Sequence, residues 1–350
     1  MSKLKDVAKI SGVAISTASR ILNGDSSRTI KPETAKKVIE AAKAIGYVKS
    51  TIKPARNSSK GESGKNVCIM NSIYENFSDP FFSKLLVAIK NEFRQSGLEL
   101  DFAYTYDDLS RLGSFQGLFS NNLIGSLILL CNMPSDALKK LKTKVSNIIC
   151  ISDLYDIINY EVDCIGYDSK EAIAQCVDFL AAKGHKDILF ITGDYNNTLI
   201  QDNDFGIDLT PPPDIRKEGY IKGLERNSLK LHNSLIQIGF WDYESSYSII
   251  ENVYGKIPFS AVIAANDKMA LGAMNCLIHK GLNIPQDIAV IGFDDIELAQ
   301  YTNPPLTTVH VPIEELGRMA VQKVLYNKQS TTPQISKTII PCSLTIRQST

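Results

Sequence analysis

Residues 4–23 read LKDVAKISGVAISTASRILN. Their apolar side chains form two groups with the i, i+3, i+4 spacing of amphipathic helices: Leu4, Val7 and Ala8, then Ala18, Ile21 and Leu22. Gly12 and Val13 interrupt the period between the two groups. Two short amphipathic helices joined by a tight, glycine-containing turn are typical of a helix-turn-helix motif.

A third run with the same period follows and consists of Ala35, Val38, Ile39, Ala42 and Ile45. Pro32 suits the first turn of this third helix, and Gly46 lies just past its last turn. Helices this short need packing against each other, because an isolated short helix is marginal in water. We therefore expect residues 1–50 to form a compact three-helix domain.

The amino-terminal part of the chain is strongly basic. Residues 1–65 contain 14 Lys and Arg against 5 Asp and Glu, a net charge of +9, so the rest of the chain carries −9 and the total is zero. Because neutralising phosphates releases condensed counterions, a basic cluster of helices is typical of a nucleic-acid-binding domain. Lysine-rich helices can also be merely soluble. Helix-turn-helix spacing and positive charge together favour DNA.

Four segments of this region resemble the amino-terminal signature of the LacI/GalR family of transcription regulators: residues 4–8, 11–13, 17–23 and 46–47. The resemblance implies that Ile15 and Ser16 meet base edges from the start of a recognition helix. It also implies that Arg20 is a third base-reading residue. This is chemically sensible, since an arginine can pair with both guanine O6 and N7, whereas Ile15 offers only apolar contact.

Ile15 has an alternative role in the core of the helical domain. We expect it to be exposed instead, because Ala18, Ile21 and Leu22 already fill the inward stripe of its helix. The polar side chains of the same helix are candidates for phosphate contacts, which position a protein on DNA without reading its sequence. These candidates are Thr17, Ser19 and Asn23.

Residues 51–65 lose the apolar period and read as a hinge or linker rich in Ser, Lys, Gly, Asn and Pro. In the family that the sequence resembles, a hinge helix forms here on DNA and inserts a leucine into the minor groove. This chain lacks that leucine, and Pro54 interrupts any helix. Ile52 and Ala55 are the aliphatic candidates for such a wedge, so we expect smaller DNA bending than in typical relatives.

The composition excludes several classes of protein. No segment reaches eighteen consecutive apolar residues, and the amino terminus has no apolar signal-peptide core. We therefore expect a cytoplasmic protein that neither crosses nor binds a membrane. The seven cysteines show no metal-binding spacing, so buried, reduced thiols are expected: Cys68, Cys131, Cys150, Cys164, Cys176, Cys276 and Cys342.

From residue 66 onward, short apolar strands alternate with helices. Strands are predicted at 67–70, 98–104, 126–131, 148–151, 188–192, 261–264 and 288–291, and helices at 79–93, 171–182, 216–225 and 269–280. Near-continuous apolar strands are typical of parallel sheets buried on both faces. Two successive series of such units imply two doubly wound lobes with a cleft between them.

The predicted fold class is therefore α/β. A small all-α helix-turn-helix domain precedes a two-lobed domain of doubly wound parallel sheets at residues 66–350, similar to the periplasmic binding proteins. We expect one lobe at about 66–165 plus 299–328 and the other at about 166–298 plus 329–350. The acidic, proline-rich stretch 202–213 fits neither series and has no predicted role.

Ligands of doubly wound sheets bind beyond the carboxyl ends of the strands. Asn266-Asp267 and Asp294-Asp295 follow two predicted strands, and Arg216 opens a predicted helix. Amides, carboxylates and an arginine suit a hydroxyl-rich ligand such as a sugar. Each residue also has a structural alternative: Asn266 as a helix N-cap, Asp294 as a loop residue and Arg216 as a surface helix residue.

The resemblance to the LacI/GalR family extends over this body, at residues 184–185, 265–272, 281–288, 292–295 and 304–309. It implies that Arg216, Asn266 and Asp294 occupy the principal effector-binding positions. It further implies an acid at Glu171, as in sugar-binding members, and places Asp168 near the cleft.

An enzyme is not expected. The chain has no GxGxxG, GxSxG or HExxH motif, and its four histidines are isolated from one another: His185, His232, His279 and His310. Asp294-Asp295 could form a metal pair, but tandem carboxylates in loops are more often solvated or hydrogen-bonded. We expect neither a metal nor a cofactor.

The sequence predicts a transcriptional repressor that binds operator DNA as a homodimer and is released by a small sugar. Similarity to repressors of β-galactoside use makes a β-galactoside one candidate. No leucine heptad follows the apolar run 338–346, which favours a dimer over a tetramer. The alternatives are a regulator with a purine-like co-repressor and a cytoplasmic sugar-binding protein that does not bind DNA.

Overall fold

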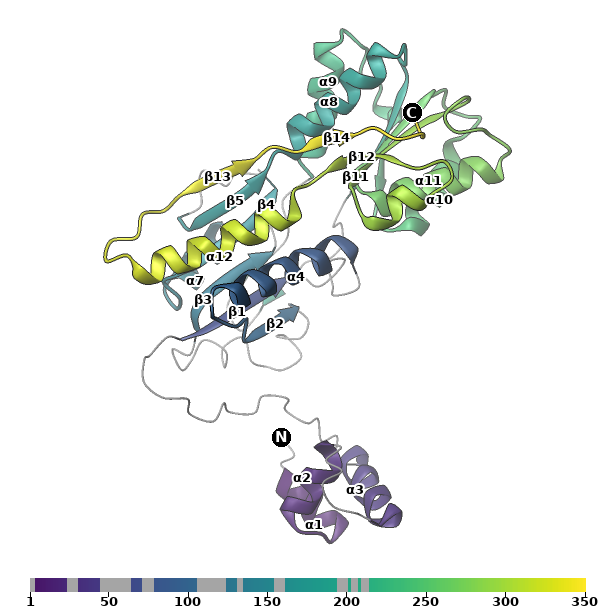
Figure 1. The fold of residues 1–350 in the computed structure, drawn as a ribbon. Coiled ribbons are helices and arrows are strands. Elements are labelled where there is room, and N and C mark those ends of the chain that lie inside the picture. The colour runs from purple at the N-terminus through teal and green to yellow at the C-terminus, as the bar shows by residue number, and fades with distance from the viewer. Residues whose placement is uncertain are drawn as a thin grey trace. The chain divides into compact units, whose positions relative to one another are not determined.

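The computed structural model describes residues 4–23, 31–44, 64–70, 79–105, 124–130, 135–153, 161–193, 201–202, 207–208 and 214–350. The chain separates into two compact units, Met1–Glu62 and Ser63–Thr350. The small unit holds three helices and the large unit holds two main sheets with their covering helices (Figure 1). Within the described ranges, no helix is both long and apolar enough to span a bilayer.

The small unit consists of α1 (Leu4–Ser11), α2 (Ile15–Asn23) and α3 (Pro32–Ala44). Its core is formed by Val7, Ala8, Ala18, Val38 and Ala41. Gly12 makes the turn between α1 and α2 at φ +66°, where a side chain would be strained. The turn is closed by a hydrogen bond from the Val13 N–H to the Ala8 carbonyl (3.0 Å). The predicted helix-turn-helix fold is confirmed.

One predicted core position of α3 is wrong. Val38 and Ala41 face inward, but the Ile39 side chain is 45% exposed. The apolar period permits Ile39 on the inner stripe, but Val38 and Ala41 are the α3 residues that pack with Val7, Ala8 and Ala18 in the core. Ile45, Gly46 and the hinge residues Ile52 and Pro54 lie outside the described residues.

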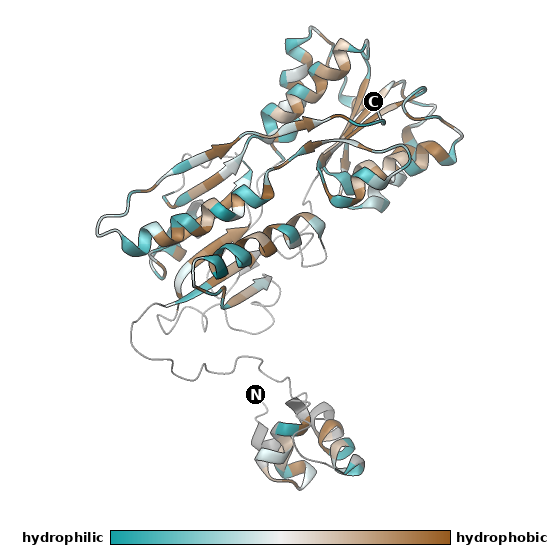
Figure 2. Ribbon diagram, viewed as in Figure 1, coloured by the Kyte–Doolittle hydropathy of each residue, from teal (hydrophilic) through white to brown (hydrophobic). Residues whose placement is uncertain are grey.

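The first sheet of the large unit has the strand order β13-β5-β4-β3-β1-β2, and all of its pairs are parallel. Its strands are β1 (Lys65–Met70), β2 (Phe102–Thr105), β3 (Ile124–Leu130), β4 (Ile148–Asp153), β5 (Asp163–Tyr167) and β13 (Lys337–Ile340). Its helices are α4 (Pro80–Gln95), α7 (Ser135–Lys142) and α12 (Ile313–Gln329). We call these elements the N-lobe. Figure 2 shows hydrophobic strands in this sheet and hydrophilic outer faces on α4 and α12.

The second sheet has the order β14-β12-β11-β10-β6-β9, and only β14 is antiparallel to its neighbour. Its strands are β6 (Ile188–Gly193), β9 (Ile236–Gly239), β10 (Ala261–Ala264), β11 (Ala289–Asp294), β12 (Thr307–His310) and β14 (Ser343–Thr345). Its helices are α8 (Ser169–Ala182), α9 (Arg216–Arg226), α10 (Tyr243–Val253) and α11 (Asp267–His279), with 3-10 turns η2 (Asn233–Leu235) and η3 (Glu297–Tyr301). We call these elements the C-lobe. A short hairpin, β7 (Gln201–Asp202) and β8 (Ile207–Asp208), lies in the stretch that had no predicted role.

The chain crosses between the lobes at other positions than predicted. β12 pairs with β11 in the C-lobe, with Thr308 beside Gly292, although residues 299–328 were expected in the N-lobe. β13 pairs with β5 in the N-lobe, with Thr338 beside Ile165, although residues 329–350 were expected in the C-lobe. The apolar run 338–346 looks like one strand, but Pro341 and Cys342 divide it between the two sheets.

The described cysteines are free, as predicted. Five of them are buried and Cys342 is partly buried, while Cys131 lies outside the described residues. Cys150 and Cys164 are direct neighbours on the parallel strands β4 and β5. These thiols serve as small apolar core residues.

Helices α8 and α9 of the C-lobe pack closely against each other. A Cβ atom at Gly219 would collide with the Lys170 carbonyl oxygen, and one at Gly223 would come within 2.6 Å of the Val177 Cβ. The Tyr220 ring stacks on Phe190 of β6 with ring centroids 5.1 Å apart. Glycine thus fixes how deeply the start of α9 sits against α8.

We predict that Gly219→Ala lowers the free energy of unfolding by about 1–3 kcal/mol, because the added methyl forces the two helices apart. Exposed Lys217 on the same helix supplies the control, and Lys217→Ala should change stability by less than about 0.5 kcal/mol. Urea denaturation measures both. Equal stability of the two variants would contradict the close packing.

Candidate functional site

The second helix of the small unit presents a polar face. Ser16 is exposed, and Thr17 and Arg20 are partly buried. Ser16 and Arg20 lie one turn apart, on the side of α2 opposite buried Ala18. The side chains of Ile15, Ser19 and Asn23 are outside what the structure describes, as is Ile52.

The small unit also carries its positive charge outward. The exposed cations among its described residues are Lys9, Lys31, Lys36 and Lys37. Exposed lysines around a polar helix face suit a surface that follows a phosphate backbone. The small unit therefore combines an exposed polar helix face with exposed positive charge, two features that nucleic-acid-binding domains share.

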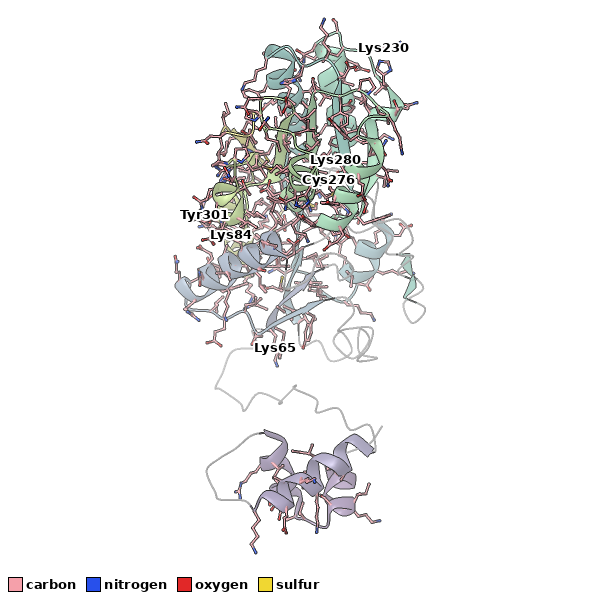
Figure 3. The ribbon with its side chains drawn as sticks, turned by 90° about the vertical axis from the view of Figure 1, so that its right-hand side faces the viewer. Lys65, Lys84, Lys230, Cys276, Lys280 and Tyr301 are labelled. Atoms are coloured by element: carbon pink, nitrogen blue, oxygen red, sulfur yellow. The ribbon has the colours of Figure 1, made fainter. Side chains whose placement is uncertain are left out.

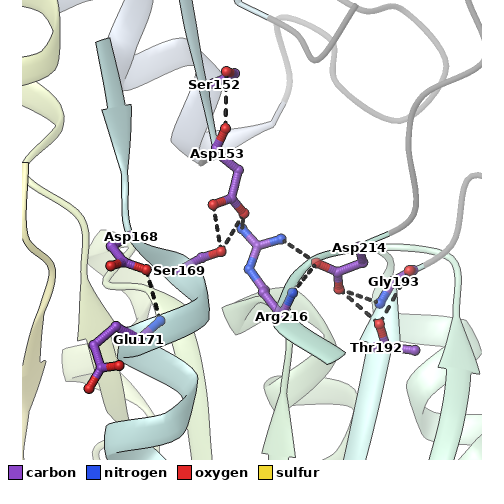
Figure 4. Close-up of polar contacts among 9 residues, drawn as sticks. All are labelled: Ser152, Asp153, Asp168, Ser169, Glu171, Thr192, Gly193, Asp214 and Arg216. Carbon is purple, nitrogen blue, oxygen red and sulfur yellow. Dashed lines mark hydrogen bonds and ion pairs between the residues drawn. The ribbon is translucent and has the colours of Figure 1, made fainter. Parts of the chain in front are cut away.

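In the large unit, a buried arginine joins the two lobes. Arg216 is the first residue of α9 in the C-lobe, and only 7% of it is exposed. Its guanidinium is 3.3 Å from the Asp214 carboxylate and 3.8 Å from the carboxylate of Asp153, the last residue of N-lobe strand β4. Figure 4 shows Arg216 between these two carboxylates. The ion pair with Asp153 joins the C-lobe to the N-lobe.

Both carboxylates are held in place by further hydrogen bonds. The Ser169 hydroxyl, at the start of α8, donates to Asp153 at 2.5 Å. Asp214 accepts from the Thr192 hydroxyl (2.8 Å) and from the Gly193 N–H (3.3 Å), both at the carboxyl end of β6. Strand ends of both sheets thereby fix the geometry around Arg216.

Aromatic rings complete the surroundings of the arginine. The Arg216 guanidinium carbon lies 4.5 Å from the centre of the Phe293 ring and 5.2 Å from that of Trp241. Burial by itself would lower the pKa of Arg216, but the carboxylates of Asp214 and Asp153 outweigh it and the pKa is raised well above its ordinary value. Arg216 therefore stays charged.

Asp294 and Asp295 follow β11, but their surroundings differ. Asp294 is partly buried at φ +111°, and burial together with nearby Asp267 raises the pKa of its carboxyl well above the usual range. Asp295 is paired with His310 (2.9 Å) and Arg347 (2.6 Å). No side-chain hydrogen bond joins Asp294 to the described residues, while Asp295 ties the loop after β11 to β12 and to Arg347. The described residues contain no cluster suited to a metal ion.

Asn266 is the N-cap of α11. Its Oδ1 accepts from the Met269 N–H at 2.8 Å, and its Nδ2 donates to the Trp241 carbonyl at 3.0 Å. The capping alternative therefore describes one role of this side chain. The second bond holds Trp241, which has φ +61°, beside Arg216.

Glu171 and Asp168 have partners away from the arginine. The Glu171 carboxylate pairs with Lys222 (2.7 Å) and Arg226 (3.0 Å) of α9, and these bonds lower its pKa. Asp168 caps α8 by accepting from the Glu171 N–H at 2.8 Å. In Figure 4 the Glu171 carboxylate points away from Arg216. The structure does not bring Glu171 together with Arg216 and Asp294.

Sequence reasoning missed Asp153, Trp241 and a second ion pair across the cleft. In that pair, Lys268 of α11 lies 3.0 Å from Asp79, the N-cap of α4. Asp153 is the last residue of the apolar strand β4, so the strand-end rule identifies it when applied to every strand. Trp241 follows a strand with little apolar signal, and the sequence gives no comparable indication for it.

Comparison with known proteins agrees with this architecture. Residues 3–50 match bacterial regulatory proteins of the lacI family, and residues 177–350 match the periplasmic binding protein-like domain. The combination defines a class: DNA-binding regulators with a ligand-binding-type body. The similarity of this chain to the LacI family rests on residues 3–50 and on repressors that align over almost its whole length.

Relatives among curated proteins align over almost the whole chain. The HTH-type transcriptional repressor PurR of Pasteurella multocida is 28% identical over 92% of this chain and 90% of its own length. The ribose operon repressor of Escherichia coli K12 is 27% identical over 95% of both chains. Both are repressors by name.

Solved structures share the fold. A complex of the transcriptional regulator CelR with cellobiose has a TM-score of 0.68, 23% identity and full coverage of both chains. A lac repressor dimer bound to operator and the anti-inducer ONPF has a TM-score of 0.65 and 22% identity, covering 99% of this chain and 98% of its own.

A buried carboxyl beside the cleft gives a pH prediction. Asp267 is fully buried and accepts from the Thr308 hydroxyl and the Ile296 N–H, and burial raises its pKa from 3.8 to about 7. The folded state thus holds this proton more tightly than the unfolded state. The resulting stability is fully present below about pH 4 and is lost as pH rises through about 7.

We predict that Asp267→Asn removes this loss, which is on the order of 4 kcal/mol in the wild type. The amide keeps the shape and still accepts one hydrogen bond. Denaturant unfolding from pH 4.5 to 8 measures the difference in slope between the two proteins, with exposed Asp136→Asn as the control. Parallel pH profiles for wild type and Asp267→Asn would show that Asp267 is ionised throughout.

Proposed function

We propose that this protein is a cytoplasmic, sequence-specific DNA-binding repressor that acts as a homodimer and whose operator affinity is controlled by a small-molecule effector. The effector, a sugar, binds between the lobes and acts as inducer. The observation that carries the proposal is Arg216, a charged residue of the C-lobe that pairs with N-lobe Asp153 at 3.8 Å. A ligand at this position contacts both lobes at once.

In the DNA-binding domain, α2 is the recognition helix. Ile15, Ser16 and Arg20 read base edges, and Arg20 pairs with a guanine. Thr17, Ser19 and Asn23 contact phosphates, and Ile52 of the hinge approaches the minor groove. The exposed polar face of α2 and the net charge of +9 over residues 1–65 support this assignment.

In the effector site, Arg216, Asp294 and Asn266 bind sugar hydroxyls. Asp294 accepts, or donates when protonated, and the second amide hydrogen of Asn266 has no partner among the described residues. Trp241 and Phe293 offer apolar ring faces beside these polar groups. Asp168 positions the start of α8 near the cleft.

A homodimer also fits the surface of the C-lobe. Leu298 and Tyr301 of η3 are 54% and 69% exposed, and Tyr301 lies on the outside of the large unit in Figure 3. Large exposed apolar side chains suit association with a second copy. A two-fold dimer presents two recognition helices to a palindromic operator.

A purine co-repressor is the second candidate function, because a 28% identical relative is named PurR. The two candidates have opposite effects on operator affinity: a sugar inducer lowers it, and a purine co-repressor raises it. A β-galactoside is one sugar among those to be tested. The aromatic faces of Trp241 and Phe293 suit a planar purine as well as a sugar ring.

The experiment uses operator DNA selected from random sequence by the full-length protein. Sugars, including β-galactosides, cellobiose and ribose, and purine bases are titrated into the preformed complex and release is followed by fluorescence anisotropy. Release by a sugar supports the proposal. Strengthened binding with a purine, and no release by any sugar, would establish the second candidate instead.

We predict that Arg216→Ala and Asp294→Ala keep operator affinity but raise the inducer concentration needed for release about 5- to 150-fold. A sugar hydroxyl left without its charged partner costs about 1–3 kcal/mol. Glu171→Gln is the matched control, since its carboxylate faces α9, and it should release normally. Unchanged release in both alanine variants would place the effector elsewhere.

For the recognition helix, we predict that Arg20→Ala weakens operator binding by about 1–3 kcal/mol and relaxes specificity at one base pair. Binding to operator fragments with single base changes measures this. Lys9→Ala, at an exposed position of α1, should instead lower the affinity for all operator fragments by the same factor. Uniform weakening in Arg20→Ala would make Arg20 a phosphate contact.

A further inference from the structure

The charges around the effector site have a negative excess. Two cations, Arg216 and Lys268, stand against four carboxylates, Asp79, Asp153, Asp214 and Asp294. Arg216, Lys268 and Asp79 all act on the charge state of Asp294, so these groups share one neighbourhood. If Asp294 is protonated, the net charge of these six groups is −1 instead of −2, so it is still negative.

Both cations are already committed to carboxylates. Arg216 directs one terminal nitrogen at Asp214 (3.3 Å) and the other at Asp153 (3.8 Å). Lys268 is 3.0 Å from Asp79. A site built for a carboxylate or phosphate ligand presents the fork of an arginine to that ligand, because bidentate pairing gives both energy and geometry. Here one terminal nitrogen is hydrogen-bonded to Asp214 and the other faces Asp153 as an ion pair, while the buried Nε has no hydrogen-bond partner among the described residues.

Asp153 is the N-lobe carboxylate that faces Arg216. It is 6% exposed and accepts a hydrogen bond from the Ser169 hydroxyl at 2.5 Å, so moving it away from Arg216 to admit an anion would break that bond. Asp214 is fixed in the same way by Thr192 at 2.8 Å. An anionic ligand at Arg216 would face two rigid, partly desolvated negative charges.

We propose that Asp153 makes the effector site selective for uncharged polyhydroxy compounds over anionic sugars such as uronates and sugar phosphates. The inference rests on the proposed function and names the class of effector that the same site takes. Hydroxyl groups donate to Asp153 and Asp294 and accept from Arg216, so a neutral sugar satisfies carboxylates that a uronate would repel.

The test uses neutral probes and their anionic counterparts with the full-length protein: D-galactose with D-galacturonate, and D-ribose with ribose 5-phosphate. Calorimetry gives the affinity of each. In the wild type, the neutral member of a pair that binds should bind at least about tenfold more tightly than its anionic counterpart. Asp153→Asn keeps one acceptor for Ser169. It should reduce the ratio of neutral to anionic affinity about tenfold, mainly because the anionic probe binds more tightly.

Asp136→Asn removes the same charge from an exposed side chain of α7 that has no contact with Arg216 and should leave the ratio unchanged. An anionic probe that binds the wild type as tightly as its neutral counterpart overturns the inference but leaves the sugar effector standing. So does an unchanged ratio in Asp153→Asn. Should that variant not fold, the wild-type ratio decides alone. Failure of every sugar to bind, with binding of a purine base, overturns the proposed sugar effector as well.

Discussion

The burial of one positive charge constrains much of the large unit. Arg216 is 7% exposed, and a guanidinium this far from water must be paired to remain charged. Its partners come from both lobes: Asp214 lies just before α9, and Asp153 ends β4. Removing either carboxylate would leave a buried charge less well compensated, which is costly. The end of β4, which carries Asp153, and the end of β6, which holds Asp214, are therefore both tied to Arg216.

The loops around this centre are held by groups that a ligand does not need to touch. Asp267 ties the start of α11 to β12 and to the loop after β11, and Asp295 binds His310 and Arg347. Asn266 connects α11 to the backbone of Trp241. Such supporting bonds keep the polar groups of the cleft in position before a ligand arrives, which reduces the ordering cost of binding.

Periodic apolar residues made much of the fold predictable. The spacing of Val7, Ala8 and Ala18 indicated the helix-turn-helix, and the apolar runs at 148–151 and 261–264 indicated buried parallel strands. Ile39 was misplaced because periodicity does not show how closely helices approach. The lobe membership of β12 and β13 could not be predicted, since it depends on pairing between strands far apart in the chain.

The candidate site was predictable only in part. The strand-end rule and family resemblance together indicated Arg216 and Asp294, but not the carboxylates that hold the arginine. Glu171 illustrates the limit of position alone: it lies in the first turn of α8, yet its carboxylate pairs with Lys222 and Arg226 of α9. Which neighbour a charged side chain finds is decided by tertiary packing, and the sequence order of α8 and α9 does not specify it.

The central claim is that occupancy of the cleft and binding of the operator are coupled. Linkage requires the coupling to be reciprocal. Operator DNA must therefore lower the affinity for the inducer by the same factor by which the inducer lowers the affinity for operator DNA. The direct measurement is the affinity of the best-binding neutral sugar for the full-length protein, determined calorimetrically with and without saturating operator. The account predicts that this ratio equals the ratio of operator affinities without and with saturating sugar. A sugar affinity that operator DNA leaves unchanged would contradict it.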